Sequence, residues 1–377
     1  MHPKCKKKSF LKMLPYVFVK LVCFVSFVSL AYRKVFEKKA TTKLGKGGYE
    51  VVGNQGRGVF STVLRVRYLK NNEIYVIKVI RNNETMFKAG QKEIDFLLSI
   101  KNRDNDNSKH CIRLLDHFEY RNHLCLVFEP MECNLRQLLK KVGAGKGFSI
   151  NAVYSYAKQL MKALQLLSSL GIVHVDIKPD NILVSENRKI VKLCDFGSGY
   201  KLEDVEITPI IGSRYYRAPE VMIGLHWDCG VDMWSMACCL FELYTGKILF
   251  AGDTNNHMLK LHCEMVGKFP VKVGKKGLFW SEHFDDCGRF LEDVVDSVSG
   301  LQLKEIHNFT QPTRDLMEAL HPNGTDEYNR LPIHERKKVN EFRDLLKQIL
   351  ILDPAKRITP EMALKHPFCK NPMKKSQ

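Results

Sequence analysis

The chain has 377 residues, of which 45% are hydrophobic and 27% are charged. This composition suits one large domain or two lobes with a substantial core, and it excludes a disordered tail, a collagen and a small disulfide-stapled module. Lysine and arginine outnumber aspartate and glutamate by 59 to 41, which gives a formal net charge of +18. The first 46 residues carry +11 of it, so the remaining chain has only the modest charge of an ordinary soluble domain.

The most hydrophobic stretch of the sequence is Leu14–Ala31, which follows a lysine cluster. Three interpretations remain open. It is a cleaved secretion signal ending at the small residues Ser29-Leu30-Ala31, a short membrane span, or an appendage outside the fold. Lys20 near the middle costs a membrane span about 2.5–3.5 kcal/mol. We therefore treat residues 1–44 as a separate basic and hydrophobic segment, with membrane contact through 14–31 as an alternative.

Cysteine usage and charge distribution indicate the compartment and exclude some partners. The chain has twelve cysteines but no Cys-x-x-Cys pair, which favours reduced thiols in a nuclear or cytoplasmic protein. The basic N-terminal cluster lacks interleaved aromatic residues on which bases could stack, so no direct nucleic-acid binding is expected.

From Tyr49 onward the pattern of apolar residues predicts an α+β fold with a strand-rich first lobe, 45–130, and a helical second lobe, 131–377. Weak periodicity over 268–335 predicts an irregular insertion. The expected strands are Tyr49–Val52, Val63–Val66, Ile74–Ile80, Cys111–Phe118 and Leu124–Phe128. The expected helices are Phe87–Ile100, Leu135–Lys141, Asn151–Leu170, Val231–Tyr244, His257–Met265 and Val339–Leu350.

A glycine-containing run, Gly56–Val63, lies between two of the expected strands. Glycine allows backbone N–H groups to approach phosphates closely, although Ser61 stands where a third glycine is usual and an ordinary hairpin turn fits Gly56 and Gly58 equally well. Further along, Lys78 lies on a strand and Glu93 on a helix. A lysine that holds nucleotide phosphates needs such a carboxylate to orient it, but taken alone the two residues fit unrelated surface charges better.

The run from His174 to Leu183 carries the most specific signal, because Asp195-Phe196-Gly197 follows at the spacing that phosphoryl transfer requires. Asp176 is placed to accept a hydroxyl proton, and Lys178 to neutralise the transferring phosphoryl group. Asn181 and Asp195 supply the oxygen ligands that Mg²⁺ prefers. Ala218-Pro219-Glu220 then follows in order.

With these motifs, the sequence from Tyr49 to Phe368 resembles the eukaryotic protein kinases. The resemblance implies a bilobal protein-kinase fold, ATP and Mg²⁺ as cofactors, and protein substrates phosphorylated on Ser or Thr. It also implies that Glu129 and Met131 meet the adenine edge through their backbone, that Glu220 pairs with Arg357, and that Asp232 braces the catalytic loop. The further cofactor-binding residues it implies are Gly56, Gly58, Val63, Val76, Lys78 and Leu183.

Within that family, Ser213–Glu220 and the long insertion before Arg357 resemble the CMGC group, near its dual-specificity tyrosine-regulated branch. Four runs resemble the pre-mRNA-processing Ser/Thr kinases of that branch, which implies spliceosomal substrates and a nuclear location. These runs are Ile80–Glu84, Thr245–Phe250, Thr254–Leu261 and Leu350–Thr359.

Three positions depart from the pattern of most kinases. Val175 replaces the usual arginine before Asp176, and Val76 replaces the usual alanine above the adenine. Ile210 stands where relatives in the branch carry an activation-loop tyrosine. We therefore expect the loop to be ordered by packing of Ile210 and Ile211, or through hydroxyl residues nearby, rather than by a phosphotyrosine at 210.

Two alternatives to an active soluble kinase remain. A pseudokinase scaffold predicts loss of at least one catalytic residue, and all six are present: Lys78, Glu93, Asp176, Lys178, Asn181 and Asp195. A membrane-anchored kinase depends on residues 14–31 alone.

The chain shortened to begin at Thr42 is expected to be soluble and to retain kinase activity, because no catalytic motif lies before Tyr49. Expression of the shortened and full chains, followed by a phosphate-transfer assay, checks this. An insoluble or inactive shortened chain would mean that the N-terminal segment packs on the domain.

Overall fold

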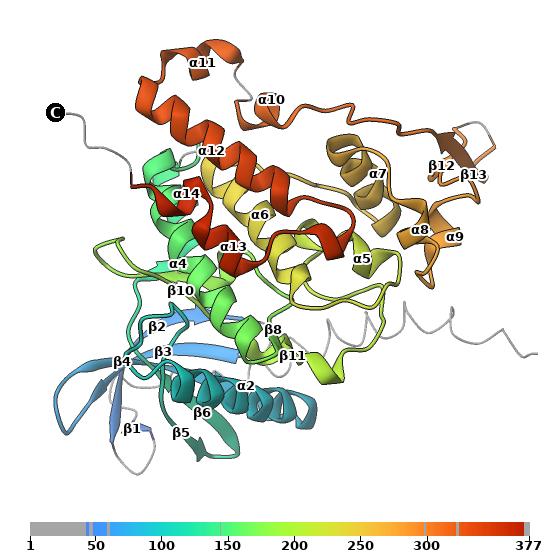
Figure 1. Ribbon diagram of the computed structural model, residues 1–377. Helices are drawn as coiled ribbons and strands as arrows, with labels where there is room; N and C mark the ends of the chain where they lie inside the picture. The colour runs from blue at the N-terminus through green and yellow to red at the C-terminus, as the bar shows by residue number, and fades with distance from the viewer. Residues whose placement is uncertain are drawn as a thin grey trace, which may run out of the picture. The chain divides into compact units, whose positions relative to one another are not determined.

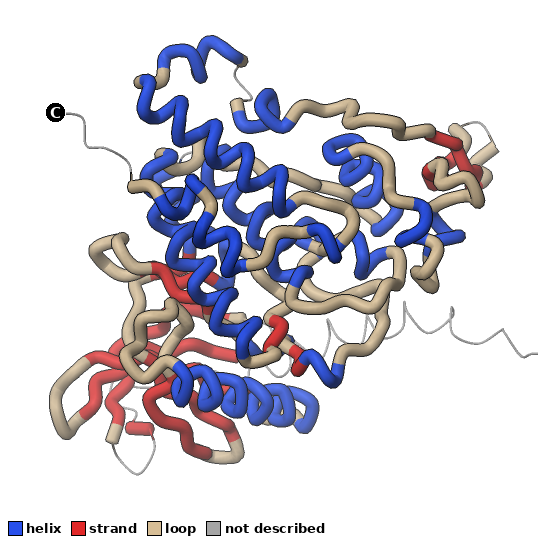
Figure 2. The backbone as a smooth tube through the Cα atoms, viewed as in Figure 1, coloured by secondary structure: helices blue, strands red, loops and turns tan. Residues whose placement is uncertain are grey.

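The computed structural model describes most of the chain, and its described residues fall into two compact units (Figures 1 and 2). Unit 1 contains the described residues up to Arg81 together with Phe118–Cys125, and unit 2 contains Asn82–His117 and the chain from Leu126. The described residues are 43–44, 48–58, 61–143, 145–297, 299–321 and 324–372.

A six-stranded sheet with the order β1-β2-β3-β4-β6-β5 builds unit 1, and the ends of β5 and β6 belong to unit 2. Short hairpin turns join β3 to β4 and β5 to β6, where Asn72, Arg121 and Asn122 adopt the left-handed conformation that asparagine tolerates best. The strands are β1 (Lys43–Leu44), β2 (Tyr49–Arg57), β3 (Ser61–Tyr68), β4 (Ile74–Ile80), β5 (Leu114–Tyr120) and β6 (His123–Phe128).

The pairing of β3 with β4 runs without a register shift, so the strand alternation separates two faces. One face carries Leu64, Val66, Ile77 and Val79, each at most 4% exposed. The other face carries Val63, Val76 and Lys78, three of the residues that the sequence assigned to the nucleotide.

Unit 2 begins with α2 (Glu84–Arg103), which contains the expected helix Phe87–Ile100 and extends it by three residues at each end. Asn83 caps its first turn by accepting hydrogen bonds from the backbone N–H groups of Thr85 and Met86. The buried side of α2 includes one carboxylate, Glu93, which is 3% exposed.

The core of unit 2 is formed around α4, on which α6, α12 and α13 pack, and α12 also packs on α6. Nearly every residue of α6 is buried, including Asp232 and Glu242. The helices after α2 are α3 (Leu135–Leu138), α4 (Ile150–Ser169), α5 (Pro219–Met222), α6 (Gly230–Thr245), α7 (Asn255–Val266), α8 (Val271–Gly274), α9 (Trp280–His283), α10 (Leu316–Leu320), α11 (Thr325–Arg330), α12 (Ile333–Ile349), α13 (Pro360–Lys365) and α14 (Pro367–Lys370).

Small sheets and single turns connect these helices. The three-stranded sheet has the order β10-β9-β7, and β8 pairs with β11. The strands are β7 (Cys133–Asn134), β8 (Ile172–Val173), β9 (Ile182–Val184), β10 (Val191–Leu193) and β11 (Tyr200–Lys201). A π-helical turn, η1 (Leu139–Gly143), follows α3, and the 3₁₀ turns are η2 (Pro179–Asn181), η3 (Phe196–Ser198), η4 (Leu202–Asp204), η5 (Arg214–Tyr216) and η6 (Pro354–Lys356).

The α+β fold expected from the sequence, with a strand-rich first part and a helical second part, is confirmed. The expectation of an irregular insertion over 268–335 is wrong in two respects. Six residue pairs join β12 (Phe290–Val295) to β13 (Gln302–His307), and the short helices α8 to α11 also lie in this range. Several apolar side chains of this hairpin, such as Leu303 and Ile306, are about half exposed. Because neither strand buries a whole face, the sequence lacks the alternation of apolar and polar residues that predicts a strand.

No helix within the described part of the chain is long and apolar enough to cross a membrane. Leu14–Ala31, on which the three N-terminal interpretations depend, lies outside the described residues.

A buried ion pair joins α5 to the turn at η6, as the sequence implied. Arg357 donates to both carboxylate oxygens of Glu220, at 2.5 and 2.9 Å, and both side chains are 1% exposed. The same guanidinium donates to the backbone carbonyls of Gly230 and Ile351. One side chain therefore ties the start of α6 and the end of α12 to α5.

Replacing Arg357 by methionine is expected to lower the free energy of unfolding by about 3–5 kcal/mol, because the Glu220 carboxylate is then buried without a counter-charge. Urea unfolding followed by circular dichroism measures this. Glu361→Gln, which breaks the exposed pair with Lys365, is the control and should change nothing measurable. Equal stability of the two variants would contradict the structural role of the buried pair.

Candidate active site

The loop between β8 and β9 carries the most specific motif, and α6 holds its start. The backbone N–H groups of His174 and Val175 donate to the two carboxylate oxygens of Asp232, at 2.7 and 2.9 Å. Burial raises the pKa of Asp232, and the two N–H groups together with His174 oppose that rise. The bracing role that the sequence implied for Asp232 is thus present in the structure.

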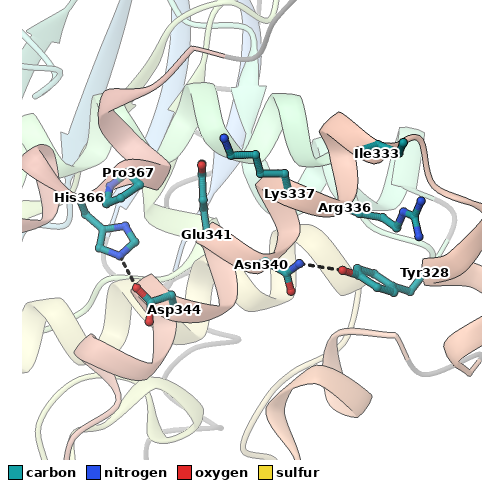
Figure 3. A pocket seen from close by; sticks show the side chains of 9 residues that line it. All are labelled: Tyr328, Ile333, Arg336, Lys337, Asn340, Glu341, Asp344, His366 and Pro367. Atoms are coloured by element: carbon teal, nitrogen blue, oxygen red, sulfur yellow. Dashed lines mark hydrogen bonds and ion pairs between the residues drawn. The ribbon is translucent and has the colours of Figure 1, made fainter.

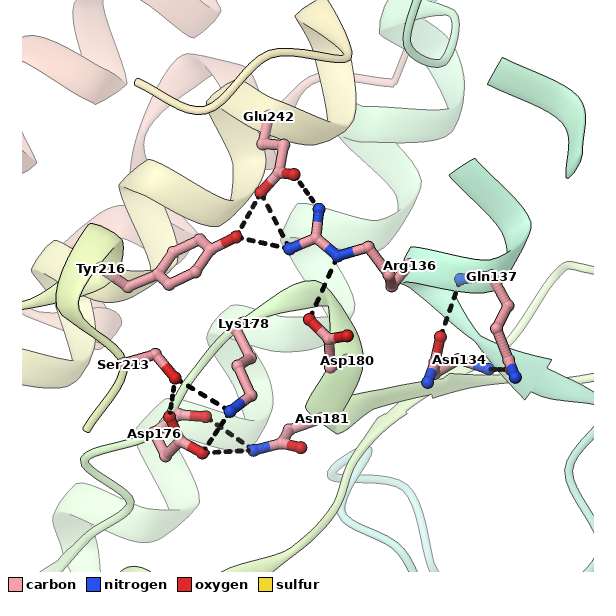
Figure 4. Close-up of polar contacts among 10 residues, drawn as sticks. All are labelled: Asn134, Arg136, Gln137, Asp176, Lys178, Asp180, Asn181, Ser213, Tyr216 and Glu242. Carbon is pink, nitrogen blue, oxygen red and sulfur yellow. Dashed lines mark hydrogen bonds and ion pairs between the residues drawn. The ribbon is translucent and has the colours of Figure 1, made fainter. Parts of the chain in front are cut away.

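Asp176 lies at the centre of a cluster in which both carboxylate oxygens are engaged (Figure 4). Lys178 Nζ lies 2.7 Å from Oδ2, and the amide Nδ2 of Asn181 donates to Oδ2 and to the backbone carbonyl of Asp176, at 3.0 and 2.9 Å. The hydroxyl of Ser213 donates to Oδ1 at 2.7 Å and accepts from Lys178 at 2.9 Å. The carboxylate thus already accepts a hydrogen bond from a hydroxyl that lies beside a cation.

Asp195 lies beside this loop at the end of β10, in the left-handed conformation with φ 67°. The N–H of Cys194 donates to the carbonyl of Asn181 at 2.9 Å, which links the two predicted metal ligands through the backbone. His174 donates from Nε2 to the carbonyl of Cys194 and accepts at Nδ1 from the N–H of Asp176, so these two bonds require the neutral Nε2–H tautomer. The buried ring of Phe196 packs edge-on against His174.

Glu93 reaches the same region from α2. A Cβ added at Gly197 would lie 3.5 Å from Glu93 Oε2 and 3.9 Å from Asp195 Oδ1, so Gly197 lies close to both carboxylates. α2 also packs on η3, which contains Gly197. The structure therefore brings together Glu93, Asp176, Lys178, Asn181 and Asp195 in unit 2.

The segment after β6 is anchored by the side chain of Glu129. Its Oε1 accepts from the N–H of Arg113 at 2.8 Å and from Lys192 Nζ at 2.6 Å. Met131 is buried, and the next residue, Glu132, donates its N–H to Val184 of β9. Because β9 also carries Leu183, this bond holds the segment with Glu129 and Met131 next to Leu183.

The remaining predicted residues share one face of the sheet in unit 1. Gly56 of β2 pairs with Val63 of β3, which pairs with Lys78 of β4, and Val76 lies two residues before Lys78 on the same face. Gly58 closes the turn by donating to Ser61 at 2.9 Å. Val59 and Phe60 lie outside the described residues.

The fold itself does not explain the glycine at 56. Its φ is not in the left-handed region, and an added Cβ would have nothing within 4 Å. At Gly58 the nearest atom would be 3.7 Å away, an ordinary contact. Open space above these backbone positions fits a bound polyphosphate.

A groove of about 520 Å³ runs along α12, between α11 and the His366–Pro367 corner (Figure 3). Its polar side chains contact one another: Asn340 donates to Tyr328, and His366 pairs with Asp344. None of the predicted site residues lines it, so it is not the candidate active site.

Sequence reasoning missed the part that four residues play around the loop. Ser213 was considered as part of a motif and as a hydroxyl that could order the loop, Asp180 only as a member of the run His174–Leu183, and Arg136 and Glu242 not at all. All four contact the loop or its supports. Their partners lie far away in sequence, so no local pattern could have revealed them.

Comparison with known proteins places this site in context. The protein kinase domain profile matches residues 49–369. The serine/threonine-protein kinase prpf4B of Dictyostelium discoideum is 45% identical over 324 residues, 85% of this chain and 40% of that protein. The serine/threonine-protein kinase prp4 of Schizosaccharomyces pombe is 44% identical over 322 residues, 85% of this chain and 66% of that protein.

A more distant relative is the dual specificity tyrosine-phosphorylation-regulated kinase 4 of Homo sapiens, 32% identical over 319 residues, which are 84% of this chain and 56% of that protein. The expected order of resemblance is confirmed, because the two prp4-type kinases are more similar to this chain than the human kinase is. The chain spans less than two thirds of the length of all three relatives.

Proposed function

Because this chain belongs to the protein kinase family, we propose that it transfers the γ-phosphate of ATP to serine or threonine hydroxyls of protein substrates. The observation that carries the proposal is the contact between the Ser213 hydroxyl, Asp176 and Lys178. A substrate hydroxyl in an equivalent contact would give its proton to Asp176 while Lys178 offsets the negative charge of the phosphoryl group.

The donor set fits a divalent cation with oxygen ligands. Both N–H groups of Asn181 are used on Asp176, so its Oδ1 is the atom left to act as a ligand, together with the carboxylate of Asp195. We propose these two residues as the Mg²⁺ ligands. Bound Mg²⁺ would neutralise charge on the phosphates.

For the nucleotide, we propose that Gly56, Gly58, Val63, Val76 and Lys78 contact ATP from unit 1. The open space at the glycines and the shared face of Val63, Val76 and Lys78 support this. From unit 2 we propose Leu183 and the backbone of Glu129 and Met131. The pairing of Lys78 with Glu93 stays a prediction.

For the substrates, we propose proteins of the pre-mRNA splicing machinery, and accordingly a nuclear location. The four runs that resemble pre-mRNA-processing kinases support this, as does the 44–45% identity to prp4 and prpf4B. A radiolabelled phosphate-transfer assay on a panel of splicing proteins, with generic basic proteins as the comparison, tests the choice of substrate.

Asp176→Asn is expected to lower kcat by about 10²- to 10⁴-fold and to leave ATP binding within about two-fold of the wild type, because it removes the proton acceptor and keeps the nucleotide contacts. Steady-state kinetics and nucleotide titration measure the two effects. Asp344→Asn, on the surface of α12, is the matched control. Equal activity of the Asp176 variant and the wild type would refute the assignment of Asp176 as the proton acceptor.

We infer that contacts of Arg217 hold the segment before Ala218 without a phosphotyrosine at 210. Arg217 donates to the backbone carbonyls of Ile211 and Gly212 and to Asn255 Oδ1, at 2.8, 3.1 and 2.7 Å. Burial lowers the pKa of Arg217 to about 10, and the charge of Arg214 adds to this, so the group is still a cation at neutral pH.

Gly212 has φ 59°, and an added Cβ would lie 2.0 Å from the carbonyl oxygen of Val175, so only glycine fits there. Ile211 is 8% exposed, as expected for a packed residue. The expectation that Ile210 also packs is wrong, because its side chain is 71% exposed. The bonds of Arg217, and those of the Ser213 hydroxyl to Asp176 and Lys178, hold the segment instead.

Protein made in bacteria and treated with a broad phosphatase is therefore expected to keep most of its kinase activity. Activity before and after treatment, with mass spectrometry to confirm that phosphate is gone, checks this. A loss of about ten-fold or more, restored by Mg²⁺ and ATP, would instead show that a loop hydroxyl such as Thr208 or Tyr215 must carry phosphate.

A further inference from the structure

Arg136 of α3 lies outside every motif of the family resemblance, yet its guanidinium joins three distant segments (Figure 4). Nε donates to Asp180 Oδ2 at 3.1 Å, Nη2 donates to the hydroxyl of Tyr216 at 2.6 Å, and Nη1 donates to Glu242. The hydroxyl of Tyr216 in turn donates to Glu242 Oε2 at 2.5 Å. The partners of Arg136 are 44, 80 and 106 residues away in sequence.

Each partner belongs to a part of the candidate site or its support. Asp180 lies in η2, between Lys178 and Asn181. Tyr216 lies in η5, three residues after Ser213, whose hydroxyl contacts Asp176. Glu242 lies in α6, the helix whose Asp232 holds the other end of the loop. The cluster therefore ties the end of the loop to the same helix that braces its start.

The electrostatics of the cluster make Arg136 hard to replace. Glu242 and Tyr216 are 2% and 5% exposed, so the carboxylate needs both donors. Burial and the charge of Glu242 raise the pKa of Tyr216, which keeps its hydroxyl protonated. Burial alone would lower the pKa of Arg136, but the hydrogen bond from Arg136 to Glu242 and the charge of that carboxylate raise it. A lysine donates from a single nitrogen, so it cannot reproduce the bonds that Nε, Nη1 and Nη2 of the planar guanidinium make.

We propose that Arg136 is a positioning residue for phosphoryl transfer, which holds the loop end at Asp180 and thereby the amide of Asn181 against Asp176. The proposal rests on the proposed kinase function. Asp180 and Asn181 are adjacent in one 3₁₀ turn, and Nδ2 of Asn181 makes two bonds to Asp176. Movement of Asp180 therefore shifts the contacts that orient the proton acceptor, while the residues proposed for the adenine keep their own anchors at Glu129.

Arg136→Lys is expected to lower kcat by about ten-fold or more and to leave KM for ATP within about two-fold, because orientation of the reacting groups is lost and nucleotide contacts are kept. Arg289→Lys is the matched control, since Arg289 Nε also donates to an aspartate, Asp285, at 2.6 Å but outside the site. The control should keep both constants.

A second variant guards against a folding defect in the first. Asp180→Asn removes the charge that Arg136 Nε contacts, and the Asp180 side chain is 42% exposed, so folding should survive. The kcat of Asp180→Asn should also fall, but by a smaller factor than that of Arg136→Lys. Amide hydrogen exchange followed by mass spectrometry should show faster exchange over 174–184 in both variants, with α4 and α6 unchanged.

The outcomes separate the two proposals. Unchanged kcat and unchanged exchange over 174–184 in both variants would overturn the role of Arg136. Faster exchange in α6 with unchanged kcat of the folded protein would also overturn it and leave a structural role only. If the wild-type protein transfers no phosphate, the proposed function fails, while the exchange measurement still decides whether Arg136 holds the loop.

Discussion

Two carboxylates buried in one helix govern the arrangement of unit 2. Asp232 and Glu242 lie ten residues apart on α6, about 15 Å along its axis, and both are 2% exposed. A buried carboxylate destabilises the fold unless donors reach it. The donors come from the catalytic loop for Asp232 and from Arg136 and Tyr216 for Glu242. The donors that the two buried carboxylates of α6 require therefore fix the position of the loop that carries Asp176.

The loop in turn organises the residues around it through its own polar groups. Asp176 accepts from Lys178, Asn181 and Ser213, which come from the loop itself and from the segment before Ala218. Most of these bonds link groups that are at least partly withdrawn from water, where geometry is held more strictly than at an exposed surface. The same bonds that stabilise unit 2 thus set the orientation of the groups proposed to react.

Neutral acceptors hold the segment before Ala218 through Arg217. Arg217 is a buried cation that donates hydrogen bonds to two backbone carbonyls and an amide oxygen. Val175, at the position where most kinases carry an arginine, is 7% exposed and adopts φ 62°, a strained conformation for a β-branched residue. The N–H of Val175 bonded to Asp232 and the approach of Gly212 help to hold that conformation.

The sequence by itself determined the fold class, the approximate places of the long helices and of five strands, and the family, because hydrophobic periodicity and motif spacing are local properties. Ile74–Ile80 coincides with β4, and the spacing of Asp176, Asn181 and Asp195 indicated their shared site. Only the tertiary structure decided that Ile210 is exposed, that the β12–β13 hairpin forms, and that Arg136 joins Asp180 to Glu242. Those features depend on partners up to 106 residues away, and burial and charge pairing between such partners leave no repeating pattern along the chain.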